Sequence, residues 1–289
     1  MAPDRLDADY LLRLRHLLGR DAGQRGTTAL PGGLVTRRRG RGLETADLRP
    51  FEIGDDPRHI DRNATARTGH PQVRTFHAER DRTTLLIADF RPSMLWGTRR
   101  VLRSIAAAEQ LCLAGWRAVA EGGRVSVIAL NAVEPVYVPP RGRDRGMIGV
   151  IGGMVRAHEA AIAAEVGGGT EGPPLAHALG MAERLAPRGA DVLLASGMDR
   201  PGTDFAAAAR ALGRRASLAI LRIADPFELA PPAGTYRYII GAEDSPAIGS
   251  VSTDPMALQG DLAIEDLSLL MTLCDSSRAV EDIGRDLPG

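Results

Sequence analysis

Apolar residues gather in short runs from residue 83 onward, and each run is long enough for one buried strand. The clearest runs are TTLLIAD at 83–89, RVSVIAL at 124–130, DVLLAS at 191–196 and SLAILRI at 217–223. Strands that are apolar along their whole length have both faces buried, which is typical of parallel sheets. The segments between them have the apolar spacing of helices. This alternation predicts an α/β fold with a parallel-type sheet covered by helices on both faces.

Helices are predicted between these strands and at both ends of the chain. Thr98 is placed to cap the longest of them. The predicted helices span residues 7–18, 98–120, 144–158, 173–185, 204–214 and 264–273. Shorter strands are predicted at 135–138, as an edge strand, and at 237–240.

The N-terminal part differs in composition from the rest. Residues 19–42 are rich in Gly, Arg and Thr, and residues 43–82 are polar with few apolar anchors. They form either a separate subdomain or a set of turns and short strands around the core. We divide the chain into an N-terminal helix and extension (1–82), an α/β core (83–245) and a C-terminal helical segment (246–289).

Composition narrows the classes of function. The chain has 289 residues, of which 44% are hydrophobic, enough for a full core. All 36 basic residues are arginine and 36 acidic residues balance them, so net charge does not favour nucleic acid or a membrane surface. The two cysteines lie far apart, which fits a reducing compartment. With no signal-peptide pattern and no run of about 20 apolar residues, we expect a cytoplasmic protein without direct membrane insertion.

Side chains that carry oxygen are predicted at one edge of the sheet. Ligand sites in open α/β sheets lie at the carboxyl ends of the strands. Asp89 ends the first core strand, Ser93 follows it, Thr170 follows a glycine run, and Ser196 ends the third strand. Such oxygens are the ligands that Mg²⁺ prefers. Arg91 lies between the first two and offers only hydrogen-bond donors and a permanent positive charge.

Other motifs carry weaker signals. The arginine-rich run at 37–41 contains no aromatic residue, so we expect a solvated or acid-paired loop. GDD at 54–56, with Asp61, is expected to form salt bridges with neighbouring arginines. GGGT at 167–170 lacks the lysine of a P-loop, and no serine lies in a nucleophile-elbow motif.

A longer motif precedes the first core strand: GRGLETADLRPFEIGDDPRHIDRNATARTGHPQVRTFHAERD, residues 40–81. It resembles the bacterial domain-of-unknown-function family 58, whose members carry a von Willebrand factor A-like domain. The resemblance covers roughly residues 40–225. Arg62 departs from the family, which usually has tryptophan there. The residues that carry the resemblance are Gly42, Glu44, Arg49, Gly54, Asp55, Asp56, Arg58, Ile60, Asp61, Ala66, Arg67 and Glu79.

The resemblance implies a Rossmann-like fold and a metal-ion-dependent adhesion site built on an Asp-x-Ser-x-Ser motif. Asp89, Ser93 and Thr170 match three of the five ligand positions of such a site. Arg91 replaces the middle serine, and Gly197 replaces the aspartate expected after the third strand. Neither residue supplies a side-chain oxygen. We therefore expect a degenerate, empty site, with residual Mg²⁺ binding as the open alternative.

Arg91 has two interpretations. Its guanidinium either lies near the vacant metal position and pairs with Asp89, because a planar fork suits a carboxylate, or it points to solvent beside a decayed site. Asp199, two residues after Gly197, would need a loop shift to act as a ligand.

The resemblance also implies a partner, because family members often accompany an AAA+ ATPase of the MoxR type. We expect a non-enzymatic adaptor without cofactor that binds this ATPase or its client. The binding face would comprise Asp89, Arg91, Ser93, Thr170 and Asp199, with an acidic group of the partner paired to Arg91. Two alternatives are a metal-dependent hydrolase or other enzyme that uses the acidic N-terminal segment, and a structural subunit of a membrane-associated complex.

Overall fold

The computed structural model describes residues 4–18, 45–52, 60–76, 82–168, 171–238, 247–251 and 270–279. The chain divides into two compact units. Unit 1 comprises Met1–Gly33 and Arg82–Gly289, and unit 2 comprises Leu34–Asp81. The N-terminal helix, which we had grouped with the extension, therefore belongs with the α/β core.

Unit 1 is built on a six-stranded sheet. Its strands, in spatial order, are β10 (Leu270–Asp275), β7 (Ser217–Ala224), β6 (Asp191–Ser196), β3 (Thr83–Asp89), β4 (Arg124–Leu130) and β5 (Val136–Gly142). The first five strands are parallel, and β5 pairs antiparallel with β4 at one edge. The four strands predicted from the apolar runs are confirmed, as is the edge strand, which is longer than predicted.

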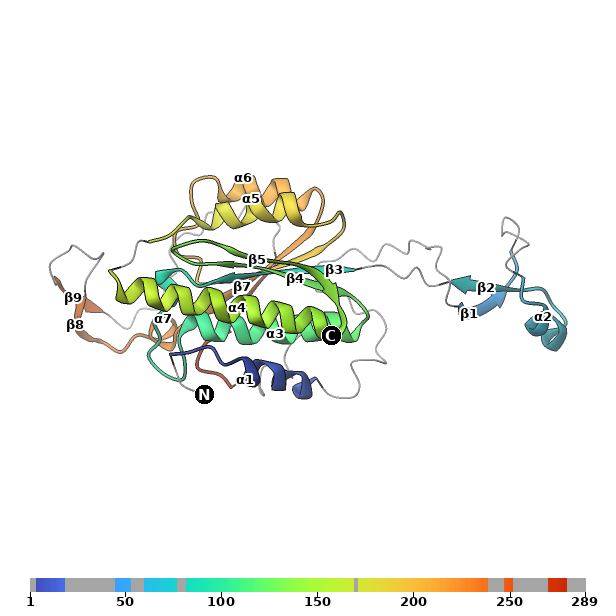
Figure 1. Ribbon diagram of the computed structural model, residues 1–289, viewed down its shortest axis with the longest axis horizontal. Helices are drawn as coiled ribbons and strands as arrows, with labels where there is room; N and C mark the ends of the chain where they lie inside the picture. Colours follow the sequence, from blue (N-terminus) through green and yellow to red (C-terminus); the bar gives the residue numbers. More distant parts are fainter. Residues whose placement is uncertain are drawn as a thin grey trace. The chain divides into compact units, whose positions relative to one another are not determined.

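Helices cover both faces of this sheet (Figure 1). One face carries α3 (Arg103–Ala120) and α4 (Arg143–Val166), with α1 (Ala8–Arg13) and the short 3-10 helix η1 (Leu14–Leu17) beyond them. The other face carries α5 (Leu175–Leu185) and α6 (Phe205–Gly213). This layering is the doubly covered α/β architecture that the apolar runs predicted.

Strand β3 shows how the sequence builds both layers. Successive side chains of a strand point to opposite faces of the sheet. Leu86 and Ala88 therefore belong to the apolar cluster under α3 and α4, whereas Leu85 and Ile87 belong to the cluster under α5 and α6. All four are almost completely buried. On the first face, a Cβ at Gly115 would collide with the Met147 side chain, so this glycine allows α3 and α4 to approach closely.

Helix α4 is long and apolar enough to cross a membrane by length and composition alone. No predicted segment met this criterion, because the expected helix stopped at residue 158. In unit 1 α4 packs on α3, β4 and β5, and Met147, Val150 and Met154 are buried in the core. This packing is that of a core helix.

Three predictions about secondary structure are wrong in part. Residues 270–273, predicted as the end of a helix, form the parallel edge strand β10; residues 264–269 lie outside the described part. The strand predicted at 237–240 pairs outside the main sheet, in a hairpin of β8 (Gly234–Tyr238) and β9 (Ala247–Val251). Helix α3 begins at Arg103 rather than after Thr98, because the backbone N–H of Thr98 donates to the carboxylate of Asp225 instead of starting the helix.

Unit 2 contains a hairpin of β1 (Thr45–Pro50) and β2 (Gln72–Phe76), with α2 (Arg62–Thr68) between the strands in sequence. Asp61 caps α2 by accepting a hydrogen bond from Ala64 N at 2.8 Å, and Gly69 ends it with a left-handed φ of 73°. Arg62 is exposed on this helix. Residues 37–41 and 54–56, for which we predicted a solvated loop and salt bridges, lie outside the described part.

Candidate functional site

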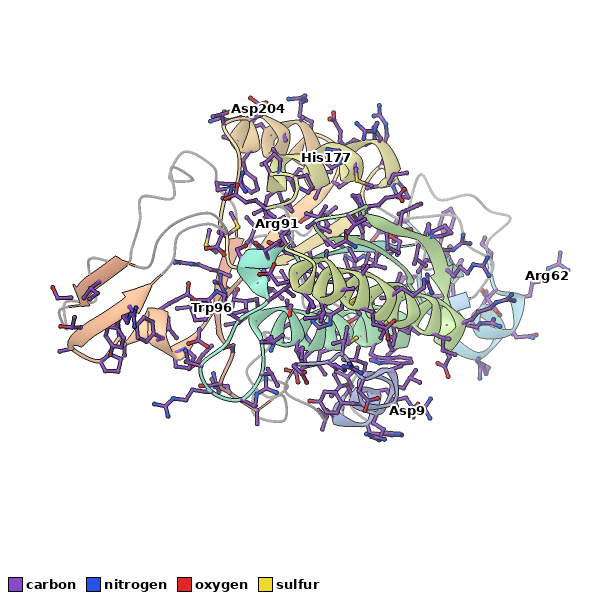
Figure 2. The ribbon with its side chains drawn as sticks, turned by 60° about the vertical axis from the view of Figure 1, so that its left-hand side comes forward. Asp9, Arg62, Arg91, Trp96, His177 and Asp204 are labelled. Carbon is purple, nitrogen blue, oxygen red and sulfur yellow. The ribbon has the colours of Figure 1, made fainter. Side chains whose placement is uncertain are left out.

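The candidate site lies where the parallel strands of the main sheet reach their C-terminal ends, which we call the carboxyl edge. There β3 and β6 end side by side. Asp89 is the last residue of β3 and Ser196 the last of β6. The two strands are parallel neighbours in register, with Ala88 opposite Ala195. Parallel pairing therefore brings together two side chains that are 107 positions apart in the sequence. Arg91 and Trp96 are labelled at this end of the sheet in Figure 2.

The guanidinium of Arg91 occupies the centre of the site. Its Nε and one terminal nitrogen donate to Asp89 Oδ1 and Oδ2, both at 2.8 Å. The same terminal nitrogen donates to the carbonyl of Asp199 at 2.7 Å. The other donates to the carbonyls of Pro173 at 3.1 Å and Arg200 at 3.2 Å. An arginine has five N–H donors, so each of them has an acceptor here.

Asp89 is satisfied as completely as its partner. Ser196 Oγ donates to Asp89 Oδ2 at 2.6 Å, and the backbone N–H of Arg91 donates to Oδ1 at 3.1 Å. The Ser196 hydroxyl in turn accepts from Met198 N at 2.9 Å. The side chains of Asp89 and Arg91 are 0% and 2% exposed. A buried ion pair of this kind needs full hydrogen bonding to offset the cost of removing both charges from water.

The loop after β6 is shaped to accept the arginine. Met198 and Arg200 have φ angles of 66° and 50°, in the left-handed region that non-glycine residues rarely adopt. Each such conformation costs of order 1–3 kcal/mol. These turns bracket Asp199, and the carbonyls of Asp199 and Arg200 both accept from Arg91. The backbone strain is therefore held in place by the arginine.

A second buried arginine lies beside the first. Arg103, at the start of α3, donates to Asp199 Oδ2 at 2.8 Å and lies 3.4 Å from Glu228 Oε1. It also donates to the Ser93 carbonyl at 3.4 Å, and its guanidinium carbon lies 5.3 Å from the centroid of the Trp96 ring. The sequence patterns did not single out Arg103, because nothing local shows that a helix start will meet the loop after β6.

Gly197 is explained by this second arginine. A Cβ atom at residue 197 would overlap the guanidinium of Arg103 and crowd the carboxylate of Asp199. The space that a side chain at 197 would need is thus filled by Arg103. Glycine at position 197 therefore leaves the space that the guanidinium of Arg103 occupies.

A third buried side chain, Asp225, holds the loop before α3. It follows β7 and accepts hydrogen bonds from both the N–H and the hydroxyl of Thr98. It also begins the short helix α7 (Pro226–Leu229) through a capping box with Glu228. Burial acts to raise the pKa of Asp225, but the hydrogen bonds from Thr98 and Phe227, with nearby Arg103, hold the pKa below its ordinary value.

The expected site residues have different outcomes. The pairing of Arg91 with Asp89 that we set against a solvent-facing arginine is present. Ser93 is half-buried and meets Arg103 through its carbonyl, and Thr170 lies outside the described part. Asp199 directs its carboxylate to Arg103 rather than toward Asp89.

The expected role of Arg91 as a contact for a partner's carboxylate does not fit this geometry. Its side chain is 2% exposed, and all five donors point at acceptors of this chain. An incoming acidic group would have to displace Asp89 or three loop carbonyls. Arg91 and Asp89 are therefore buried beneath the surface at this end of the sheet.

The described residues hold no group of three or more His, Cys, Asp or Glu side chains arranged for a metal ion. They do contain one pair that resembles a nucleophile and base, since Ser104 Oγ lies 3.0 Å from His158 Nε2. Both side chains are buried between α3 and α4, and the His158 ring packs edge-on against Phe90. Burial lowers the pKa of His158 to about 4. Without access to substrate, this pair is a hydrogen bond of the core.

The fold and site define a class: an α/β protein with a mostly parallel six-stranded sheet and a buried arginine–aspartate pair at its carboxyl edge. The model of the family described as "Protein of unknown function DUF58" matches residues 47–253, more than half of the chain. The chain therefore belongs to this family, as the signature at 40–81 predicted.

Similar proteins are found in mycobacteria and among solved structures. Uncharacterized proteins of Mycobacterium bovis and Mycobacterium tuberculosis are each 35% identical over 106 residues. That match covers 35% of this chain and 32% of each relative, so the chain spans about a third of the relatives it matches.

Two solved structures have the same sequence identity to this chain, 16%. The hypothetical protein BatB of Bacteroides thetaiotaomicron has a TM-score of 0.45, and the match covers 71% of this chain and 96% of that one. A von Willebrand factor type A protein of Catenulispora acidiphila has a TM-score of 0.43, covering 72% and 41%. An aerotolerance-related membrane protein of Bacteroides fragilis is 14% identical, with a TM-score of 0.41, covering 71% and 98%.

Proposed function

We propose that this protein is a non-enzymatic interaction module whose binding face is the carboxyl edge of the main sheet. The observation that carries the proposal is the Arg91 guanidinium, which joins Asp89 to three loop carbonyls. In a degenerate metal-ion-dependent adhesion site, this guanidinium takes the role of the ion. It holds three loops in one arrangement without needing a metal from solution.

The chemistry of the site supports binding rather than catalysis. Asp89 and Ser196, which carry a potential base and nucleophile, are buried and hydrogen-bonded within the chain. A catalytic acid or base must reach the proton that it transfers. The groups at this edge that reach solvent include Asp199 and the ion-paired Arg200 and Glu171. These groups are suited to contact a protein surface.

The partner that we propose is an AAA+ ATPase of the MoxR type, or a client of that ATPase, in the assembly or maturation of a complex. This choice rests on membership of the family, because the resemblance implies that its members often accompany such ATPases. Such a partnership would place the protein in the cytoplasm. Because the pairing of Arg91 with Asp89 is internal, the interaction would be independent of Mg²⁺ at this site.

The test is direct binding between the full chain and a purified MoxR-type ATPase from the same genome. The ATPase is used without nucleotide, in buffer with either EDTA or Mg²⁺, and affinity is measured by biolayer interferometry. We expect the same affinity in both buffers. We expect Trp96→Ala, at the face, to weaken binding and Glu121→Gln, at the opposite edge of the sheet, to leave it unchanged. Binding that requires Mg²⁺, or that both variants weaken equally, contradicts the proposal.

A further inference from the structure

At the carboxyl edge, one cluster of charged residues contains more carboxylates than guanidinium groups. Arg91 and Asp89 neutralise each other below the surface, and Arg200 and Glu171 form an exposed ion pair. This cluster consists of Arg103 with two carboxylates, Asp199 at 2.8 Å and Glu228 at 3.4 Å. Two carboxylates thus share one guanidinium. Trp96 completes this group of residues, which we call the Arg103 cluster.

The negative groups of the Arg103 cluster are the ones that reach solvent. The side chain of Asp199 is 36% exposed and that of Glu228 27%, whereas that of Arg103 is 2% exposed. A molecule approaching this point meets carboxylates above a buried cation. Burial is the main cause that raises the pKa of Glu228, and the negative charge of Asp199 adds to the rise, although Arg103, a backbone hydrogen bond from Asp225 and Arg222 oppose it. The two carboxylates therefore interact electrostatically.

Arg103 is held unevenly. Its one short bond goes to Asp199, and its other contacts, to Glu228 and the Ser93 carbonyl, are both 3.4 Å long. Arg103 Nε is buried and has no hydrogen-bond partner among the described residues. Most buried polar groups are hydrogen-bonded, so this donor is an exception that needs a reason. A small movement toward Glu228 would keep Arg103 paired while it releases Asp199.

Trp96 adds an apolar surface suited to a cation. Its half-buried ring already lies against the Arg103 guanidinium, with 5.3 Å between the guanidinium carbon and the ring centroid. Tryptophan is the aromatic side chain that attracts cations best. A second guanidinium or ammonium group could meet the exposed carboxylate of Asp199 beside this ring.

We propose that the Arg103 cluster binds a basic side chain, arginine or lysine, of the protein partner. Asp199 is the primary contact, and Arg103 moves toward Glu228 when the incoming cation arrives. This inference rests on the proposed function and gives the chemistry of its partner. It reverses the polarity expected from the sequence, in which an acidic group would meet Arg91.

The two tryptophans of the chain supply a built-in test. Trp96 belongs to the Arg103 cluster, whereas Trp116 is buried in α3 and donates to the Leu11 carbonyl. The ¹⁵N-labelled full chain is titrated with a capped Gly-Arg-Gly-Arg-Gly peptide, and both indole N–H signals are followed by NMR. A capped Gly-Glu-Gly-Glu-Gly peptide is titrated in parallel.

We expect the arginine peptide to shift the Trp96 signal to saturation and to leave Trp116 unmoved. Asp199→Asn should weaken this binding roughly tenfold, since it removes a charged acceptor. The matched change Glu121→Gln, at an exposed acid of the opposite edge, should leave binding unchanged. The unmoved Trp116 signal also reports that each variant remains folded.

Two results would overturn the inference. If the glutamate peptide alone shifts Trp96, the face binds partners of the opposite charge, so the proposed function survives and the basic partner does not. If neither peptide shifts Trp96 at millimolar concentration, or Asp199→Asn binds like the wild type, the Arg103 cluster is not the contact. The ATPase binding experiment then decides the proposed function separately.

Discussion

Arg91 and Asp89 meet through two parallel hydrogen bonds of 2.8 Å, although only one residue separates them in the sequence. The short link lets the arginine fold back over the end of its own strand. From there it reaches the carbonyls of Pro173, Asp199 and Arg200 on two other loops. One side chain thus joins the end of β3 to the loop before α5 and to the loop after β6.

The first prediction concerns the stability of this pair. Arg91→Met should lower the free energy of unfolding by about 3–5 kcal/mol, because it leaves the Asp89 carboxylate buried without a cation. Replacing both residues, as Asp89→Leu with Arg91→Met, should recover a large part of that loss. Urea unfolding at pH 7 of the wild type, both single variants and the double variant measures the coupling. A loss below about 1 kcal/mol for Arg91→Met would show that the pair contributes little to the stability of the fold.

The second prediction concerns Mg²⁺. Changing Arg91→Ser and Gly197→Asp supplies side-chain oxygens at two ligand positions that the family resemblance implies, but the new aspartate would overlap Arg103. We therefore expect no binding heat from Mg²⁺ in calorimetry for the wild type or for this double variant. The triple variant that adds Arg103→Ala should bind Mg²⁺, and a further Asp89→Ala should abolish that binding.

Two outcomes would disagree with this prediction. Mg²⁺ binding by the wild type that is lost in Asp89→Ala would mean that the ion displaces Arg91. Binding by the double variant would mean that Arg103 leaves its position readily, against the packing described for Gly197.

The third prediction concerns the attachment of the N-terminal helix. Tyr10 of α1 donates to the fully buried Glu109 carboxylate at 2.9 Å, and Arg100 pairs with the same carboxylate. Tyr10→Phe should lower the free energy of unfolding by roughly 1.5–3 kcal/mol, the usual range for a hydrogen bond to a charged group. Tyr236→Phe removes an exposed hydrogen bond to Pro232 and serves as the control, with a change below about 0.5 kcal/mol. Equal losses of stability in the two variants would mean that the hydrogen bond to Glu109 contributes no more than an exposed one.

The fourth prediction concerns pH. Burial lowers the pKa of His158 to about 4 from an ordinary value of 6.5. Between these values the unfolded chain binds a proton that the folded chain does not, so stability rises with pH. The contribution of His158 is fully present above pH 6.5 and is lost as the pH falls toward 4, with roughly 3 kcal/mol at stake.

The measurement is urea unfolding from pH 7 to pH 4. His158→Gln should flatten the part of the pH dependence that lies between the two pKa values. The same change at exposed His177 should leave the curve as in the wild type. If His158→Gln and the wild type lose stability in parallel, the histidine does not carry this effect.

The sequence by itself determined the layers of the core and the position of the site. The runs at 83–89 and 191–196 are apolar throughout, and a strand with that composition must be buried on both faces. Parallel strands end at the same edge, so Asp89 and Ser196 were expected together. The charge of Arg91 next to Asp89 also made their pairing one of two interpretations.

Tertiary structure decided what surrounds that pair. Arg103 and Asp199 are 96 positions apart, and no local pattern relates a helix start to the loop after another strand. The same holds for Thr98, which resembles a helix cap in the sequence but bonds to Asp225, 127 positions away. Residues 270–273 have no strand signal strong enough to oppose a helical pattern, and the open edge of β7 selects the strand. Hydrogen bonds and charges at long range depend on how the chain is folded, which the spacing of residues along one segment does not specify.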